Sequence, residues 1–123
     1  MTENTRAAGK KYEADAVDFL VKKNFKILEK NYRAKSGGEI DIIAVDRETV
    51  VFVEVKAREK MTGQHPFEAV DIRKQKKIIR AAREFLTSKN MWKNYMRFDV
   101  VGIITENRNI LKIEHAVDAF GDN

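Results

Sequence analysis

The sequence predicts an α/β domain in which a small mixed sheet is flanked by helices. Residues 5–23 and 67–87 carry apolar side chains at the spacing of amphipathic helices. Residues 39–45, 50–57 and 97–104 are rich in the isoleucine, valine and phenylalanine that favour strands. With two weaker strands added, the order is helix, three strands, helix, two strands. A chain of 123 residues has the length of one domain, so we treat residues 1–123 as a single unit.

The first helix is predicted over residues 5–23. Tyr12 and Phe19 belong to its apolar face, which recurs at helical spacing. Asn24 is a residue type that commonly ends a helix. We expect residues 1–4, which precede the pattern, to be disordered.

Three strands are predicted to follow this helix. The first covers residues 26–34 and ends before the turn signal at residues 36–38, Ser-Gly-Gly. The second and third, residues 39–45 and 50–57, are separated only by the polar residues 46–49. So short a connection predicts that the second and third strands form a hairpin.

The second half of the chain is predicted to add a helix and two strands. Residues 58–65 form a loop, and Pro66 is tolerated in the first turn of a helix over residues 67–87. Residues 97–104 are almost continuously apolar, which indicates a strand buried on both faces. Residues 110–114 form a short last strand.

Composition excludes several classes of protein. The chain has no cysteine, which excludes a disulfide scaffold, a zinc ribbon and a thiol nucleophile. No apolar run approaches the roughly 18 residues of a membrane span, and residues 1–12 lack the apolar segment of a signal peptide. We therefore expect a cytoplasmic protein with no membrane partner. The net charge of +5 favours an anionic partner, of which nucleic acid is the commonest.

The register of the hairpin follows from its apolar pattern. Pairing Val45 with Val50 makes one face wholly apolar, whereas a slip of one residue mixes apolar and charged side chains. On the other face this register places Asp41 opposite Glu54. The apolar face comprises Ile40, Ile42, Ala44, Val51, Val53 and Val55, and the other face also pairs Glu39 with Lys56.

Two opposed carboxylates in a sheet require compensation. Opposed Cβ atoms lie about 4.5–5.5 Å apart, and like charges at that distance destabilise the sheet. A shared proton, a basic neighbour such as Lys56, or a divalent cation would compensate Asp41 and Glu54. Oxygen ligands suit Mg²⁺ or Mn²⁺. The ordinary alternative is a set of solvent-facing charges on a hairpin.

Each predicted helix carries one charge on its apolar face. Glu13 falls among the apolar residues of the first helix, and Lys74 among those of the second. A charge in such a position needs a partner or a role. Either Glu13 pairs with Lys74, or Lys74 extends to water, or both helices direct these groups at Asp41 and Glu54.

The opposite face of the second helix is basic. A stripe of this kind can follow a phosphate backbone, although a solvated face is the common alternative. No aromatic residues interleave with it, so the stripe does not indicate base stacking. The basic residues are Arg73, Lys76, Lys77, Arg80 and Arg83.

These motifs resemble a known superfamily. Gly38-Glu39-Ile40-Asp41 followed by Val53-Glu54-Val55-Lys56 is similar to the D…(D/E)-x-K signature of restriction-endonuclease-like nucleases, the PD-(D/E)xK superfamily, and the predicted order resembles its αβββαβ core. More narrowly, the chain resembles the bacterial YraN-like family of predicted nucleases. Further matching segments are Gly9…Glu13, Arg58, Val70…Lys74 and Arg97-Phe98-Asp99-Val100-Val101.

The resemblance implies a role for each matching residue. Asp41 and Glu54 would be ligands of Mg²⁺ or Mn²⁺, with the Val55 carbonyl as a third donor, and Lys56 would be the catalytic lysine. Glu13 would match the helix-borne acid of the related archaeal Holliday-junction resolvases. Lys74 would match the family's lysine on the second helix, and Arg58 joins the basic stripe as a nucleic-acid-binding residue.

The function expected from the resemblance is metal-dependent hydrolysis of phosphodiester bonds by an endonuclease. DNA, including branched or junction DNA, is the first candidate substrate, and related resolvases suggest a homodimer. The alternatives are a non-catalytic nucleic-acid-binding module and an adaptor whose basic helix binds an acidic protein. We assign no role to His65 or His115, and expect Asp99 to be capping or ion-paired.

Overall fold

The computed structural model describes residues 2–121, with side chains from residue 9 onward. The backbone from Thr2 onward belongs to the first helix. Met1 lies outside the described residues, and the expected disorder of residues 1–4 stays a prediction. The elements are α1 Thr2–Lys22, β1 Lys26–Arg33, β2 Glu39–Asp46, β3 Thr49–Glu59, η1 Lys60–Thr62, η2 Pro66–Ala69, α2 Ile72–Ser88, β4 Tyr95–Glu106 and β5 Asn109–Phe120, where η marks a 3-10 turn.

The strands form one mixed sheet in the order β1-β2-β3-β4-β5. β3 and β4 are parallel, and the other neighbouring pairs are antiparallel. The α2 connection between β3 and β4 supplies the crossover that a parallel pair requires. The predicted α/β class, with a small mixed sheet flanked by helices, is confirmed.

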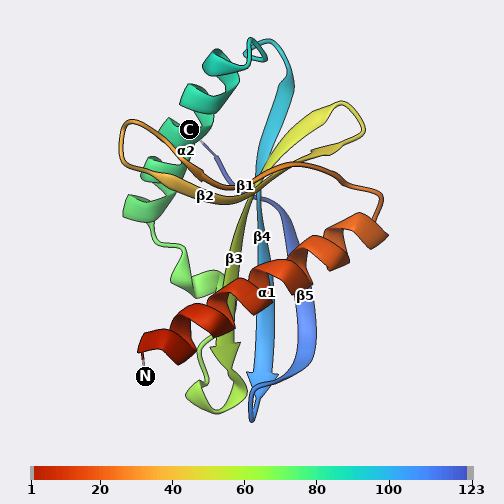
Figure 1. Cartoon of the computed structure of the whole chain (residues 1–123), viewed down its shortest axis with the longest axis vertical. Coiled ribbons are helices and arrows are strands. Elements are labelled where there is room, and N and C mark those ends of the chain that lie inside the picture. Colours follow the sequence, from red (N-terminus) through yellow and green to blue (C-terminus); the bar gives the residue numbers. More distant parts are fainter. Residues whose placement is uncertain (1, 122–123) are drawn as a thin grey trace.

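The two helices cover opposite faces of the sheet, which gives three layers. Ala16 and Leu20 of α1 pack with alternate residues of the strands in one core cluster. Ile78 and Phe85 of α2 pack on the other face in a second cluster. Figure 1 shows α1 crossing in front of β3 and β4, with α2 beside β2. Within the described residues, neither helix combines the length and apolar character of a membrane span.

The predicted hairpin register is confirmed from the turn as far as Ile42, which pairs with Val53. The expected pairing of Asp41 with Glu54 is wrong, as is that of Glu39 with Lys56, because the β2–β3 ladder ends there. Instead of continuing the ladder, the Asp41 side chain accepts a hydrogen bond from the backbone N–H of Val55, at 2.8 Å. The two strands therefore part at the residues expected to form the site.

The alternation of faces in β2 also breaks at this point. Ile40 packs with Ile43 in the α2-side cluster, whereas Ile42 packs in the α1-side cluster. The expectation that Ile40 and Ile42 share one face is therefore wrong. In β1 the residue between the partners of Ile40 and Ile42 is Asn31, whose φ of 53° is left-handed. Asn tolerates this conformation better than most residues, and it turns the edge strand here.

Several predicted boundaries require correction. α2 begins at Ile72 rather than at residue 67, because the Asp71 side chain accepts a hydrogen bond from Lys74 N at 2.9 Å and caps the helix. Pro66 begins the separate turn η2. β3 extends two residues into the predicted loop at 58–65, and the last strand is twelve residues long because it pairs along most of β4.

Asp99 is an ion-paired core residue, as expected. It is fully buried, and its carboxylate lies 3.0 Å from Arg97 Nε and accepts a hydrogen bond from His115 Nε2 at 2.7 Å. Burial alone would raise the pKa of Asp99, but hydrogen bonds from His115, Arg97 and the Asp118 backbone outweigh it and lower the pKa. His115 is thus a structural residue, and His65 caps η2.

Candidate functional site

The centre of the candidate site is the point where β2 and β3 part. Glu54, on β3, is only 3% exposed, and Asp41 on β2 lies close enough for a hydrogen bond between the two carboxyl side chains. Burial raises the pKa of Asp41 to about 8, helped by the charge of Glu54 and by that hydrogen bond. The backbone hydrogen bond from Val55 opposes this rise. Thus the predicted proximity of the two acids holds although the ladder pairing does not.

Two lysines from different elements converge on Glu54. Lys74 Nζ, from the first turns of α2, lies 2.8 Å from Glu54 Oε2. Lys56 Nζ, two residues along β3, lies 3.6 Å from the same oxygen. A buried carboxylate requires such partners. Of the readings left open, a pairing of Lys74 with Glu13 is wrong, because the described partner of Lys74 is Glu54.

The two lysines differ in how firmly each holds its proton. Burial lowers the pKa of Lys56, and a hydrogen bond with Lys74 lowers it further, which the attraction of Glu54 and Asp41 does not offset. Burial also acts to lower the pKa of Lys74, but hydrogen bonds to Glu54 and Lys56 outweigh it and raise the pKa. Lys74 is therefore the fixed cation, and Lys56 is the amine that more readily releases a proton.

α1 contributes a third acid to the same region. The Glu13 side chain is hydrogen-bonded to Asn31, the left-handed residue of β1. Burial raises the pKa of Glu13, and the charges of Glu39 and Glu54 raise it further. These interactions place Glu13 near the two acids, as predicted from its position on the apolar face of the helix.

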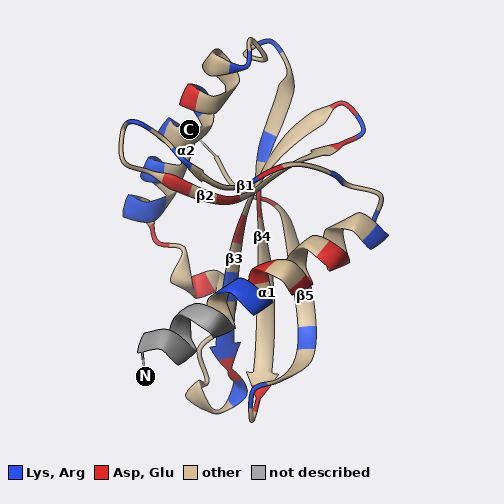
Figure 2. Cartoon of the chain, viewed as in Figure 1, with Lys and Arg blue, Asp and Glu red and all other residues tan. Residues whose placement is uncertain are grey.

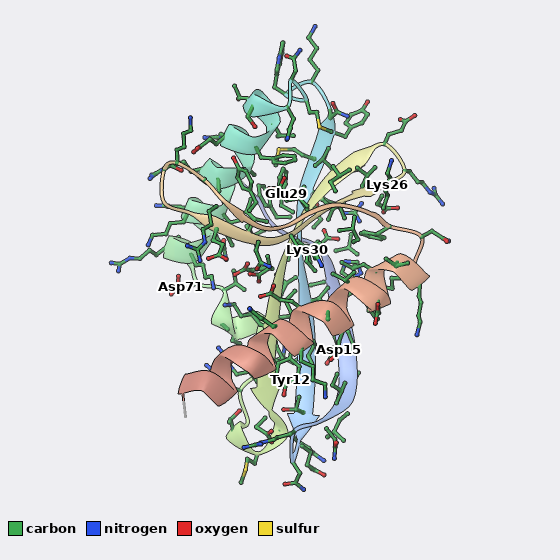
Figure 3. The ribbon with its side chains drawn as sticks, viewed as in Figure 1. Tyr12, Asp15, Lys26, Glu29, Lys30 and Asp71 are labelled. Atoms are coloured by element: carbon green, nitrogen blue, oxygen red, sulfur yellow. The ribbon has the colours of Figure 1, made fainter. Side chains whose placement is uncertain are left out.

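A hollow of about 440 Å³ joins α1 to the end of β3. In Figure 3, Tyr12 on α1 and Asp71 at the start of α2 mark the two helices that flank this region. The Arg58 guanidinium is oriented by its own β3 backbone, because Nη1 donates to the Ala57 carbonyl at 2.7 Å. The lining residues are Gly9, Tyr12, Glu13, Asp41, Val55, Lys56, Ala57 and Arg58.

Sequence reasoning missed two contributors to this site. Tyr12 was treated only as a core residue, although it lines the hollow beside Glu13. Asn31 was treated as an ordinary strand residue, although it holds Glu13. The available signal was that asparagine is depleted in strands and tolerates positive φ.

The donor set fits a hard divalent cation in its chemistry. Asp41 and Glu54 offer oxygen donors side by side, and burial together with the charge of Glu54 raises the pKa of Asp41. In the described part of the chain, no group of three or more acidic or histidine side chains is gathered around one point. Two carboxylates suit Mg²⁺, which usually keeps several waters and binds substrate phosphate.

The basic stripe lies on α2, on the side facing away from the sheet. Figure 2 shows the blue segments along this helix. A hollow of about 400 Å³ is lined by Ile72 together with four members of the stripe, Arg73, Lys76, Lys77 and Arg80. Lys74, which contacts Glu54, belongs to the first turn of the same helix but to its inner face. Arg58, in contrast, lies in the hollow beside α1 rather than on the stripe.

Gly38 sets the distance between α2 and the sheet. A Cβ at this position would lie 2.8 Å from the backbone carbonyl oxygen of Lys77 and 3.2 Å from Ala81 Cβ. Only glycine therefore lets α2 pack so closely against the β1–β2 connection. This contact sets the distance between α2 and the sheet, and therefore the distance between Lys74 and Glu54.

Comparisons with known proteins agree on one family. Residues 12–103 match the profile described as "Uncharacterised protein family UPF0102". A UPF0102 protein of Chlorobium phaeobacteroides is 45% identical over 117 residues, covering 91% of this chain and 92% of its own length. One of Caldanaerobacter subterraneus is 40% identical over 119 residues, covering 95% and 97%. One of Acetivibrio thermocellus is 46% identical over 105 residues, covering 85% and 81%. The names of these three relatives state the family and no activity.

Proposed function

The chain belongs to the family described as "Uncharacterised protein family UPF0102". We propose that it is a metal-dependent endonuclease that hydrolyses phosphodiester bonds in nucleic acid, with DNA as the first candidate substrate. The observation that carries the proposal is the buried Glu54, reached by Lys74 at 2.8 Å and Lys56 at 3.6 Å beside Asp41. Folding alone does not favour such a group of charges. The resemblance of its residues to the PD-(D/E)xK signature supports the same reading.

The acids of the site would hold the cation. Asp41 and Glu54 would bind Mg²⁺ or Mn²⁺ through carboxylate oxygens, with the Val55 carbonyl as a third donor. The chemistry supplied by such a cation is polarisation of a phosphoryl oxygen and activation of water at neutral pH. Glu13 lies near enough for its charge to interact with those of Asp41 and Glu54. Its carboxylate would hold water or a further cation there.

The lysines would act on the phosphate and the attacking water. Lys56 carries the lowered pKa, which favours its accepting a proton from water or orienting it. Lys74 keeps its charge and holds Glu54 in place. Arg58, at the mouth of the hollow, would bind the neighbouring phosphate.

The partner proposed for the stripe is the phosphate backbone of nucleic acid. Four basic residues of α2 line one hollow, and the same helix carries Lys74 to Glu54. A cytoplasmic location and a homodimer that cuts both strands belong to the same proposal.

The test is cleavage of DNA by the purified protein. Linear duplex, single-stranded and four-way-junction DNA are each incubated with Mg²⁺, with Mn²⁺ or with a chelator. We expect metal-dependent cleavage that Asp41→Asn and Lys56→Ala both abolish. Glu48→Gln and Lys112→Ala make matched changes at exposed positions that do not line the hollow, and should cut like the parent.

Two outcomes would contradict the proposal. Cleavage by Asp41→Asn at the rate of the parent would show that the acids are not its site. DNA retention with no metal-dependent cleavage would instead identify a non-catalytic nucleic-acid-binding module.

A further inference from the structure

The loop between α2 and β4 presents an exposed aromatic side chain among lysines. Trp92 is 61% exposed, and Lys93 Nζ lies 5.0 Å from the centre of its ring. Lys89, at the end of α2, is also exposed. An exposed aromatic ring among cations matches the residues that bind single-stranded nucleic acid.

This loop is held firmly against the end of the helix. Met91 N donates to the Leu86 carbonyl at 2.7 Å, and Asn94 N donates to the Met91 carbonyl at 3.0 Å. The Met91 side chain packs on the α2-side core cluster, so the next residue, Trp92, points outward. The ring is thus presented from a fixed position at one end of α2, which lowers the entropy lost on binding.

The loop lies at the end of α2 opposite to the acidic centre. Lys74 lies in the first turn of α2 and contacts Glu54, whereas Lys89 directly follows the last turn. Seventeen helical residues span about 26 Å. Nucleotides of a B-form strand are spaced by about 3.4 Å, so this length corresponds to roughly seven or eight nucleotides.

We propose that Trp92 stacks on an unpaired base of a nucleic-acid strand whose backbone follows α2 from the Asp41–Glu54 site. This inference rests on the proposed function and narrows its substrate class to nucleic acid with a single-stranded segment. Bases inside a continuous duplex are stacked on each other and offer no free face to the ring. The exposed Trp92 ring favours a nucleic acid over an acidic peptide as the occupant, because bases offer flat faces that stack on it.

Trp92 is the single tryptophan of the chain, so it reports on its own environment. Its fluorescence is measured in the presence of a chelator, so that no cleavage occurs, during titration with a single strand of about 12 nucleotides. The comparison probes are a covalently closed circular duplex, which has neither ends nor loops, and polyglutamate. Affinity is measured in parallel, by the anisotropy of labelled probes, for the parent, Trp92→Ala, Trp92→Phe and the exposed control Leu111→Ala.

We expect the single strand to quench the fluorescence and the closed duplex to leave it nearly unchanged. Trp92→Ala should bind the single strand roughly tenfold more weakly, while Trp92→Phe keeps most of the affinity because it retains a stacking face. Leu111→Ala should bind like the parent.

Equal affinity of Trp92→Ala and parent for the single strand, or equal quenching by polyglutamate, would overturn the inference. Metal-dependent cleavage without quenching would refute the inference and leave the proposed function standing. Quenching without cleavage would support it and refute the proposed catalysis.

Discussion

Lys74 Nζ lies 2.8 Å from Glu54 Oε2, so the charge on the second helix neutralises a buried acid of the sheet. The two residues are twenty positions apart and belong to different layers. Glu54 is 3% exposed, and without this partner its charge would be desolvated with only Lys56 nearby. The pair joins α2 to the point where β2 and β3 part, and it makes the orientation of the helix part of the site.

Removing the charge of Lys74 should destabilise the protein and make it depend on a divalent cation. Lys74→Met leaves Glu54 without its 2.8 Å partner, which we expect to cost about 1–3 kcal/mol of unfolding free energy without metal. Mg²⁺ should stabilise this variant more than the parent, because no ammonium competes for the carboxylate. Urea unfolding with and without Mg²⁺ measures both effects. The exposed neighbour Lys76→Met is the control, and an equal Mg²⁺ effect on Lys74→Met and the parent would contradict the prediction.

The stability of the metal-free protein should fall as the pH rises from about 4 to about 8. Unfolded Asp41 loses its proton near 3.8, whereas the folded protein raises the pKa to about 8. Across this interval the unfolded state binds fewer protons, so the stabilisation present below pH 3.8 is progressively lost up to pH 8. Asp41→Asn should therefore be about 1–2 kcal/mol more stable than the parent at pH 8.

Urea unfolding in a chelator at several values between pH 5 and pH 8 measures this effect. The raised pKa of Glu13 acts with the same sign, so the difference between parent and Asp41→Asn isolates the contribution of Asp41. Parallel stability curves for the two proteins across this range would show that Asp41 titrates normally.

Enlarging Gly38 should displace α2. In Gly38→Ala the new Cβ would meet the Lys77 carbonyl oxygen at 2.8 Å, a backbone atom that cannot rotate away. We expect a loss of about 1–3 kcal/mol in thermal unfolding. Gly9→Ala is the matched control, because its Cβ would have no neighbour within 4 Å and alanine favours a helix. Equal melting temperatures for Gly38→Ala and the parent would mean that the helix can shift without cost.

Neutralising the stripe should weaken the salt dependence of nucleic-acid binding. The triple variant Arg73→Ala, Lys76→Ala, Arg80→Ala should reduce the slope of log affinity against log salt by up to about 3, since each phosphate contact contributes roughly 0.9. Duplex DNA binding between low and moderate salt measures the slope. A control triple with the same charge change replaces the exposed lysines Lys22, Lys30 and Lys112. Should both triples change the slope equally, net charge rather than the stripe governs binding, and an unchanged slope would favour an acidic protein as the partner.

Part of the candidate site could be predicted because it depends on local periodicity. The alternation of apolar residues selected the register that pairs Ile43 with Phe52, and this register brings Asp41 near Glu54. Helical spacing placed Glu13 and Lys74 on the inner faces of their helices, and both lie near these acids. Residues with a charge on an apolar face were thus the informative ones.

Other parts of the prediction failed where a side chain competes with the backbone. The carboxylate of Asp41 accepts the Val55 N–H, so the ladder ends at Ile42 and Val53, three residue pairs earlier than expected. Asp71 caps α2 although the apolar pattern extends back to Phe67, because a capped helix start outweighs further apolar spacing. Such competition depends on the energies of single hydrogen bonds, and the spacing of apolar residues in the sequence does not reveal these energies.

By itself, the sequence determined the class of fold, the hairpin register near its turn and the charged residues that lie on apolar faces. These follow from apolar residues that repeat every two positions in strands and every 3.6 positions in helices, and from the need to bury apolar surface. Only the tertiary structure decided that Lys74 pairs with Glu54, that Asn31 is hydrogen-bonded to Glu13, and that Gly38 sets the distance between α2 and the sheet. Each of these depends on the distance between elements far apart in the chain, which is fixed by the packing of the whole core.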